Sequence, residues 1–318
     1  MEKGKKWVFI VNPVAGNGLA LSLTDRIKEM ISKHDLEADI VFTERKGHAT
    51  ELAKEFADKG YTYIIGVGGD GTMNEIARSV LSREDIILGL IAGGTGNDFI
   101  QILGFSGKFE ENDWEMFFKA QVTRMDVGYC NGKIFLNGMG LGFDAQVASE
   151  NYDENGMAKE GWKYRYIWHI LKTLLFFREK RMTVIANGAT HDTDCFINTV
   201  ANGRRFAGDF FLTPLAIAND GLLDICAIKR LSLLQRLRIL LMVPKGTHVK
   251  DKKVNYFQTD KLSLKFPTKV PFHVDGELLF ADSFDIGIMP AAVSFIYNPE
   301  GKHFLKTAAE QEVIDNQI

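Results

Sequence analysis

Residues 63–80, YIIGVGGDGTMNEIARSV, join a run of β-branched and aromatic residues to a glycine-rich turn and a helix-forming segment. The turn surrounds one aspartate, Asp70, with the glycines Gly66, Gly68, Gly69 and Gly71. A chain reversal needs only one or two glycines. Four therefore indicate a backbone that comes very close to another group. The central Asp70 is foreign to a Rossmann fingerprint, and no Gly-Lys-Ser/Thr ending of a Walker A loop follows.

Strand-like and helix-like segments alternate around this stretch. Apolar, β-rich runs are expected to form strands at residues 6–13, 37–44, 61–67 and 85–94, and residues with helical spacing are expected to form helices at 19–34, 48–60 and 72–82. Alternation at this length favours βαβ units and a parallel sheet. The first half therefore predicts an α/β domain with a parallel sheet.

The pattern changes after Arg124. Short β-type runs follow, separated by Asn-Gly, Asp-Gly and Pro signals, with helical inserts around 159–178 and 231–242. Such a pattern is typical of an antiparallel β-sandwich. We predict an α/β domain at 1–125 and a β-sandwich domain at 126–296. The C-terminal tail, 297–318, is expected to pack back on the first domain.

The bulk composition excludes several classes of protein. The chain has 318 residues, of which 46% are hydrophobic and 25% charged, and its net charge is −3. A dedicated nucleic-acid binder would carry a basic excess. The three cysteines, Cys130, Cys195 and Cys226, are odd in number and have neither disulfide nor zinc spacing, which favours a reducing cytoplasm. No apolar run reaches the roughly 18 residues of a membrane span, so any membrane contact is expected to be peripheral and transient.

Three glycine-rich loops follow strands of the expected sheet. They read NPVAGNG (12–18), GGDGTMNE (68–75) and GGTGNDF (93–99). One such loop is equally well explained as a chain reversal. Three at the carboxyl edge of one sheet favour a shared anion site, because main-chain N–H groups and helix N-termini attract phosphate. Asp70 beside phosphate favours a bound Mg²⁺, although a turn or N-cap role for Asp70 stays open.

These motifs resemble the catalytic domain of the diacylglycerol kinase family, and within it the soluble bacterial lipid kinases. The resemblance is carried by VNPVAGNG (11–18), TERKGHATELA (43–53), GVGGDGTMNEIA (66–77) and GGTGNDFIQIL (93–103), and in the second half by ANDGLLDI (218–225) and HVDGELL (273–279). It implies a first domain with a three-layer α/β fold that is Rossmann-like or phosphofructokinase-like. It also implies a lipid kinase that uses ATP and Mg²⁺, with the active site in the interdomain cleft. One departure is that Ala15 and Asn17 stand where many relatives have serine and lysine, which leaves the lipid headgroup open.

The resemblance also implies a set of site residues. ATP would contact Asn12, Pro13, Gly16, Thr43, Gly68, Gly69, Gly71, Thr72, Asn74, Glu75, Thr95 and Asn97. An acidic network linked by water and magnesium would include Asp70, Asp98 and Asp126. A structural metal site in the second domain would use Asp220 with main-chain oxygens near Ile217 and Leu222.

Asp275 matches the catalytic base of the family, and Glu277 matches an acidic neighbour. The residues alone favour a different interpretation of Asp275, because an Asp-Gly pair between alternating segments is a strong hairpin signal. A carboxylate within hydrogen-bond reach of a lipid hydroxyl could nevertheless take its proton during phosphoryl transfer. His273 lies on the same strand face, where a structural histidine is the simpler interpretation.

The stretch 160–181 mixes aromatic, leucine and basic residues, as interfacial helices do. We expect Trp162 and Trp168 to face the membrane, although core-packed helices explain this stretch and the leucine-rich 229–246 equally well. The favoured reaction is transfer of the γ-phosphate of ATP to diacylglycerol, giving phosphatidic acid. The alternatives are a sphingoid-base or ceramide kinase, a kinase of a soluble substrate similar to NAD kinase, and a non-catalytic regulator. A homodimer is left open.

Overall fold

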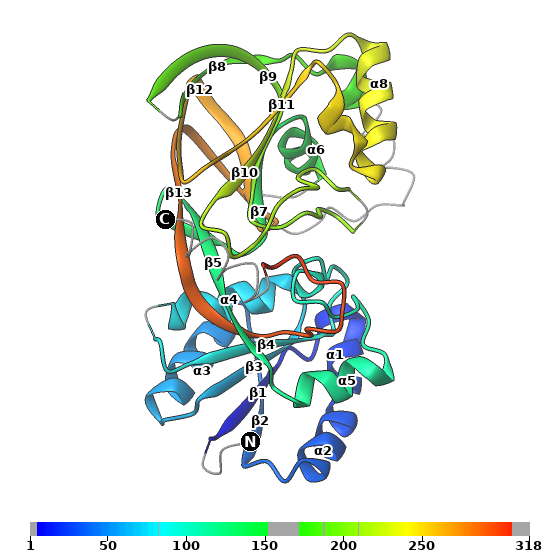
Figure 1. Cartoon of the computed structure of the whole chain (residues 1–318), viewed down its shortest axis with the longest axis vertical. Coiled ribbons are helices and arrows are strands. Elements are labelled where there is room, and N and C mark those ends of the chain that lie inside the picture. Colours follow the sequence, from blue (N-terminus) through cyan, green and yellow to red (C-terminus); the bar gives the residue numbers. More distant parts are fainter. Residues whose placement is uncertain (1–4, 82, 152–171, 187, 209, 307–318) are drawn as a thin grey trace. The chain divides into compact units, whose positions relative to one another are not determined.

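The computed structural model describes residues 5–81, 83–151, 172–186, 188–208 and 210–306 (Figure 1). The chain divides into two compact units. The first comprises Met1–Val127, Ile217–Gly221 and Met289–Ile318, and the second comprises Gly128–Ala216 and Leu222–Ile288. Residues 217–221 and 289–296, which the sequence places in the second domain, thus belong to the first unit. The reason is that the end of the last strand pairs with the first unit's sheet.

The first unit contains a parallel sheet in the order β2-β1-β3-β4-β13. Its strands are β1 (Trp7–Val11), β2 (Ala38–Phe42), β3 (Tyr63–Gly68), β4 (Ile87–Ala92) and the final residues of β13 (Glu277–Ile296). Strand β13 joins through Ser294 and Phe295, which pair in parallel with Ile87 and Leu88 of β4. Strands β1 and β3 are buried along their whole length, as expected for a sheet covered on both faces.

Helices lie on both faces of this sheet, as Figure 1 shows. They are α1 (Leu19–Ser22), α2 (Thr24–Lys33), α3 (His48–Asp58), α4 (Asp70–Val80) and α5 (Glu111–Phe118), with short 3₁₀ turns at Ala15–Gly18 and Phe99–Gln101. On the face of α2 and α5, Phe118 stacks on Trp7 and Phe9 of β1. The alternation of strands and helices predicted for this half of the chain is confirmed. Helix α5 was not predicted.

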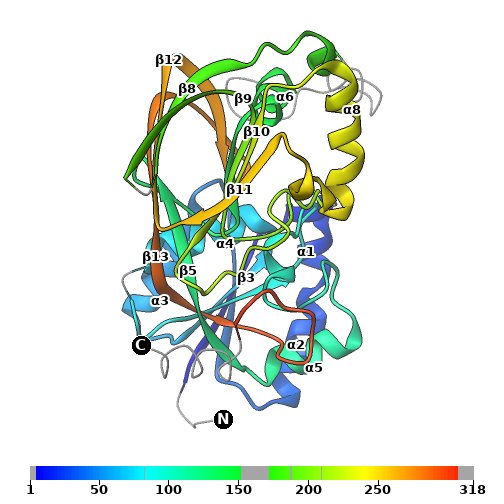
Figure 2. The ribbon, with the colours of Figure 1, turned by 45° about the horizontal axis from the view of Figure 1, so that its top comes forward.

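The second unit is antiparallel and rich in strands. It contains β6 (Lys133–Phe135), β7 (Gly138–Gly142), β8 (Lys180–Ala186), β9 (Ala189–Ala201), β10 (Leu223–Lys229), β11 (Val254–Thr259), β12 (Lys261–Val274), the end of β5 (Val122–Cys130) and the start of β13. The long strands β9 and β12 both pair with β7 at one end and with β8 at the other. Figure 2 shows the curvature of these strands.

Two apolar clusters stabilise the second unit. One lies within the curved strands and includes Phe135, Leu264 and Phe284. The other lies beneath α6 (Phe143–Asn151) and α8 (Leu233–Met242), where Phe143 and Ile239 contact Phe196 and its neighbours. The helix predicted at 231–242 is confirmed as α8. Short 3₁₀ turns at Val243–Lys245 and Thr247–Lys250 follow it.

All three cysteines are buried and free, and burial raises the pKa of the Cys130 thiol to about 12. Burial also raises the pKa of the Cys195 and Cys226 thiols, which disfavours the thiolate form of all three cysteines at neutral pH. In the described part of the chain, no helix combines the length and hydropathy that crossing a bilayer requires.

Candidate active site

The three glycine-rich loops meet at the carboxyl edge of the parallel sheet in the first unit. The first loop, 12–18, follows β1; the second, 68–72, closes β3 and begins α4; the third, 93–98, follows β4. Because β1, β3 and β4 are neighbouring parallel strands, their carboxyl ends share one edge. That edge is where ligands bind in open α/β sheets.

Glycines let the loops touch one another through their backbones. A Cβ atom on Gly16 would lie 2.5 Å from the carbonyl oxygen of Gly93, and a Cβ on Gly94 would overlap the Cα of Gly69. Side chains at these positions would force the loops apart. These glycines are therefore required by contact between the loops, whatever they bind.

Polar contacts reinforce this junction. The Asp70 carboxylate accepts the N–H of Asp98 at 2.9 Å and that of Phe99 at 3.2 Å, which ties the second loop to the third. The Asn12 amide donates to the Thr72 hydroxyl at 3.4 Å, which ties the first loop to the second. Asp70 thus has a structural role that the sequence did not reveal. Its role toward Mg²⁺ stays a prediction.

Asn97 shapes the third loop from within. Its side-chain oxygen accepts the N–H of Gly94 at 3.2 Å, and its side-chain nitrogen donates to the carbonyl oxygens of Gly94 and Gly107 at 2.9 and 2.8 Å. Thr95, at the tip of this loop, is exposed. Asn97 therefore holds the loop conformation.

The beginning of α4 fits a phosphate group. Helix α4 runs from Asp70 to Val80 with Gly69 as its N-cap, so the first N–H groups have no acceptor within the helix. Gly71 is exposed, and a Cβ atom added to it would meet no atom within 4 Å. Space for a ligand and N–H donors thus occur together here, which suits the triphosphate of ATP. Thr72 and Asn74 are buried on the inner side of the helix.

Thr43 and Glu75 lie beside these loops. The N–H of Thr43, just after β2, donates to Val11 at the end of β1 at 2.9 Å. The Glu75 carboxylate accepts the N–H of Gly47 at 3.0 Å and so links α4 to the segment after β2. Pro13 is half-buried in the first loop. Every predicted ATP contact therefore lies in the first unit, on or next to its loop edge.

Asp126 lies in β5, within the first unit, and its part in an acidic network with Asp70 and Asp98 stays a prediction. Its buried carboxylate accepts the N–H of Gly221 and that of Ala291, each at 2.7 Å. Burial raises the pKa of Asp126, the two N–H donors oppose that rise, and the charge of Asp220 adds to it. Hydrogen bonds from Gly221 N–H to the Asp126 carboxylate and from Asp126 N–H to the carbonyl oxygen of Ala218 hold the segment 217–221 on the first unit, although the charge of Asp220 repels that of Asp126.

No group of three or more His, Cys, Asp or Glu side chains able to hold a metal ion occurs among the described residues. The predicted site at Ile217, Asp220 and Leu222 relies on main-chain oxygens. Ile217 and Asp220 belong to the first unit and Leu222 to the second. This metal site stays a prediction.

Asp275 lies in the tight turn between β12 and β13, in the second unit. Its carboxylate accepts three main-chain N–H groups, from Leu136 at 2.7 Å, Asn137 at 3.1 Å and Gly138 at 2.9 Å. The backbone of Asp275 has φ +42°, in the left-handed region that aspartate tolerates better than most residues. The hairpin interpretation is confirmed, and the three donors fix the carboxylate in one orientation.

The polar residues on either side of this turn, His273 and Glu277, also have side-chain partners. Glu277 accepts a charge-assisted hydrogen bond from Lys133 at 3.0 Å. His273 contacts Asp144 of α6 at 3.1 Å, as a structural histidine would. Trp162 and Trp168, the predicted membrane-facing residues, lie outside the described residues.

Sequence reasoning missed two sets of residues at these sites. Gly93 and Gly94 make the closest approaches between the loops, and only the repeated glycines of GGTGNDF hinted at this. The N–H donors from 136–138 that hold Asp275 come from main chain, so no side-chain motif could have revealed them.

Comparisons with known proteins agree with this arrangement. The chain matches the family described as "Diacylglycerol kinase catalytic domain" over residues 6–130 and the "YegS C-terminal NAD kinase beta sandwich-like domain" over residues 137–297. It is 25% identical to a diacylglycerol kinase of Bacillus subtilis (strain 168), over 86% of this chain and 90% of that protein. It is 27% identical to a protein of Enterobacter sp. (strain 638) named "Probable lipid kinase YegS-like", over 81% and 85% of the two chains.

A solved structure has the same fold. The diacylglycerol kinase from Bacillus anthracis str. Sterne superposes with a TM-score of 0.73 at 23% identity, covering 95% of this chain and 100% of that chain. The α/β unit with its glycine loops corresponds to the catalytic-domain match, and the β-rich unit to the second match. The chain is therefore a lipid kinase of the diacylglycerol kinase family, whose members use ATP.

Proposed function

We propose that this enzyme transfers the γ-phosphate of ATP to the free hydroxyl of diacylglycerol and produces phosphatidic acid. The observation that carries the proposal is the meeting of the three glycine loops beside the start of α4, in a chain that belongs to a lipid kinase family. The relatives named diacylglycerol kinase support the choice of substrate.

The residues of the chain would act mainly by positioning. Main-chain N–H groups at the start of α4 would hold phosphate oxygens, with Asp70 and Asn97 keeping the loops in place. Mg²⁺, when bound near Asp70, would neutralise phosphate charge during transfer. Asp275 would accept the proton of the lipid hydroxyl as the phosphoryl group moves. Its three N–H donors would keep the carboxylate aimed in one direction.

The substrate is tested by phosphoryl transfer from radiolabelled ATP. Purified enzyme is given diacylglycerol, sphingosine, ceramide and NAD in parallel, and the products are separated after lipid extraction. We expect labelled phosphatidic acid from diacylglycerol and at most trace label elsewhere. Preferential labelling of any other acceptor would refute diacylglycerol as the substrate, and no labelling of any acceptor would refute the kinase activity.

A pair of glycine variants separates ligand binding from loop packing. Gly71→Ala should leave the free energy of unfolding unchanged or raise it by up to about 1 kcal/mol, because alanine favours the helix. Its methyl group meets no protein atom. The affinity for ATP should nevertheless fall about tenfold or more, since the methyl group would occupy space that a phosphate approaches. Isothermal titration calorimetry and urea unfolding measure both quantities.

Gly94→Ala is the matched control. Its Cβ would overlap the backbone of Gly69, so the free energy of unfolding should fall by about 1–3 kcal/mol. Unaltered ATP affinity in Gly71→Ala would mean that this part of α4 does not face the nucleotide.

A further inference from the structure

Helix α8 is oriented against the usual pattern, with leucines outward and an arginine inward. Its two buried residues are Arg236 and Ile239. Leu234 and Leu241 are each 78% exposed, and Leu233 and Leu237 are 42% and 43% exposed. At about 100° per residue, the four leucines fall within one arc of about 100° opposite Ile239 and Arg236. The exposed stripe is therefore a continuous apolar face.

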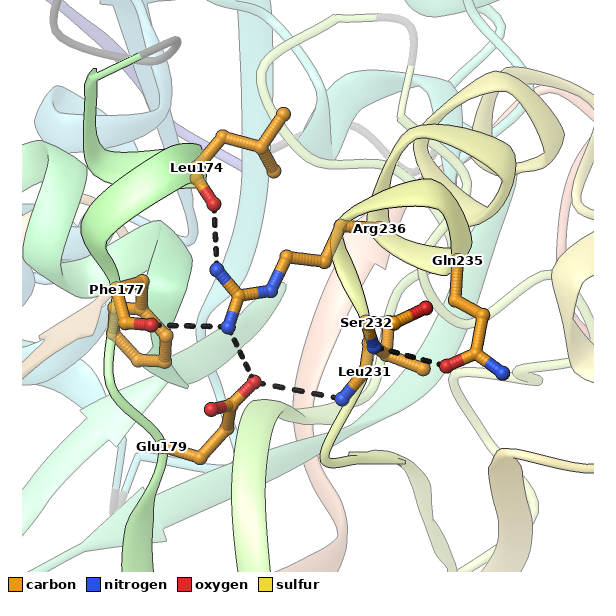
Figure 3. Close-up of polar contacts among 7 residues, drawn as sticks. All are labelled: Leu174, Phe177, Glu179, Leu231, Ser232, Gln235 and Arg236. Carbon is orange, nitrogen blue, oxygen red and sulfur yellow. Dashed lines mark hydrogen bonds and ion pairs between the residues drawn. The ribbon is translucent and has the colours of Figure 1, made fainter.

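The inward orientation is fixed by Arg236, as Figure 3 shows. Its guanidinium donates to the Glu179 carboxylate at 2.6 Å and to the carbonyl oxygens of Phe177 at 2.9 Å and Leu174 at 2.5 Å. Both charged side chains are more than nine-tenths buried. At the helix start, Ser232 and Gln235 form a capping box. These contacts prevent α8 from rotating its leucines into the core.

The same contacts bring a second pair of exposed apolar residues next to α8. Residues 172–176 are helical, and their carbonyl end is held by Arg236. Within that turn Leu174 is buried, but Leu175 is 55% exposed and Phe176 is 74% exposed. We define the leucine face as Leu175, Phe176, Leu233, Leu234, Leu237 and Leu241.

Basic residues flank this face. The chain as a whole has a net charge of −3, yet eight basic residues and one acidic residue lie between Lys229 and Lys253. Lys229 and Arg230 precede α8, and Lys245, Lys250 and Lys252 follow it, all of them exposed. The single acidic residue, Asp251, is paired with Arg238 at 3.1 Å. An apolar face flanked by cations is complementary to a surface whose outer layer is anionic and whose interior is apolar.

We propose that the leucine face and its basic flanks dock this enzyme on an anionic lipid bilayer. The leucines and Phe176 would enter the boundary between headgroups and acyl chains, and the flanking cations would contact anionic headgroups. This docking surface rests on the proposed function, because an enzyme that phosphorylates a lipid must work at a bilayer. A second copy of the same chain is a poorer occupant, because two faces with the same positive flanks would repel each other.

The test uses the full-length enzyme and sedimentation with vesicles of phosphatidylcholine alone or mixed with phosphatidylglycerol. The variant Leu234→Gln/Leu241→Gln should bind the mixed vesicles about tenfold or more weakly, because apolar insertion is lost. The control, Leu234→Met/Leu241→Met, keeps apolar side chains at the same positions and should bind as the wild type does. Lys245→Gln/Lys250→Gln should lose the preference for anionic vesicles.

Further readouts separate this proposal from its competitors. A fall in the free energy of unfolding of the glutamine variant would show that the leucines pack against the chain itself and would overturn the proposal. Loss of a dimer in light scattering, with vesicle binding unchanged, would identify the face as a contact between copies. Wild-type binding by the glutamine variant would also refute docking through this face.

Activity on a short-chain diacylglycerol dissolved below its aggregation limit tests the proposed function separately. The glutamine variant should phosphorylate this dissolved substrate at the wild-type rate. If the wild type binds vesicles through the leucine face but phosphorylates no diacylglycerol, docking stands and the proposed substrate fails. If the wild type phosphorylates the dissolved substrate but the glutamine variant keeps full vesicle binding, the docking proposal is refuted and the proposed function stands.

Discussion

Asp275→Asn should lower the turnover of diacylglycerol by about a hundredfold to ten-thousandfold, the range that a general base contributes. Asparagine accepts the left-handed backbone at this position, but it cannot take a proton from the lipid hydroxyl. The change also replaces one oxygen acceptor by an amide donor, opposite main-chain N–H groups of residues 136–138. We therefore expect some loss of stability, and turnover should be measured well below the melting temperature of the variant.

Two controls distinguish chemistry from folding in this experiment. Asp282→Asn removes the same charge from an exposed position on β13, the strand that follows this turn, and should leave turnover unchanged. ATP affinity of Asp275→Asn, measured by calorimetry, should match the wild type. Turnover within about threefold of wild type in folded Asp275→Asn would exclude the general-base role, and Asp275 would then be a hairpin residue alone.

Arg236→Met should lower the free energy of unfolding by about 3–5 kcal/mol, because it leaves the Glu179 carboxylate buried without its cation. The Arg236 and Glu179 side chains are only 8% and 7% exposed. The carbonyl oxygens of Leu174 and Phe177 would lose their donor as well. Urea unfolding followed by circular dichroism measures the change.

The neighbouring Arg238 provides the matched control. It lies on the same helix but is 67% exposed, and its partner Asp251, which is 12% exposed, keeps a hydrogen bond from the N–H of Lys253 at 2.9 Å. Arg238→Met should therefore cost less than about 1 kcal/mol. Combining Arg236→Met with Glu179→Leu should recover most of the lost stability, because the uncompensated charge is then removed. Equal losses of unfolding free energy in Arg236→Met and Arg238→Met would show that the buried ion pair contributes no more to stability than the exposed one.

The fold was largely predictable because the first unit is built from local patterns. Apolar runs of strand length, helices with one apolar face and glycines at strand ends all agree with one architecture. Helix α5 escaped prediction, because five consecutive residues from Trp114 to Phe118 are dominated by large apolar side chains and obscure any periodicity. The assignment of 217–221 and 289–296 to the first unit depends on long-range contacts such as that between Gly221 and Asp126, which sequence patterns do not encode.

The candidate site was predictable only in its loops. Glycine repeats identified the segments that meet, since contact between backbones excludes side chains. They did not reveal that Asp70 accepts hydrogen bonds from the third loop or that Asp275 accepts three N–H groups. The donors are main-chain groups, which every residue type except proline carries. Arg236 lies among leucines in the sequence, and its inward direction depends on Glu179, which is distant in the sequence.

The pairing of β4 with the end of β13 has a consequence for biosynthesis. The sheet that carries the glycine loops gains its fifth strand only from Ser294 and Phe295, close to the end of the 318-residue chain. Strand β4 therefore remains an unpaired edge of this sheet, with unbonded N–H and C=O groups along it, until residues 294 and 295 have been synthesised and pair with it. A fragment that stops after the first 125 residues should keep β4 as an exposed edge that can pair with another chain.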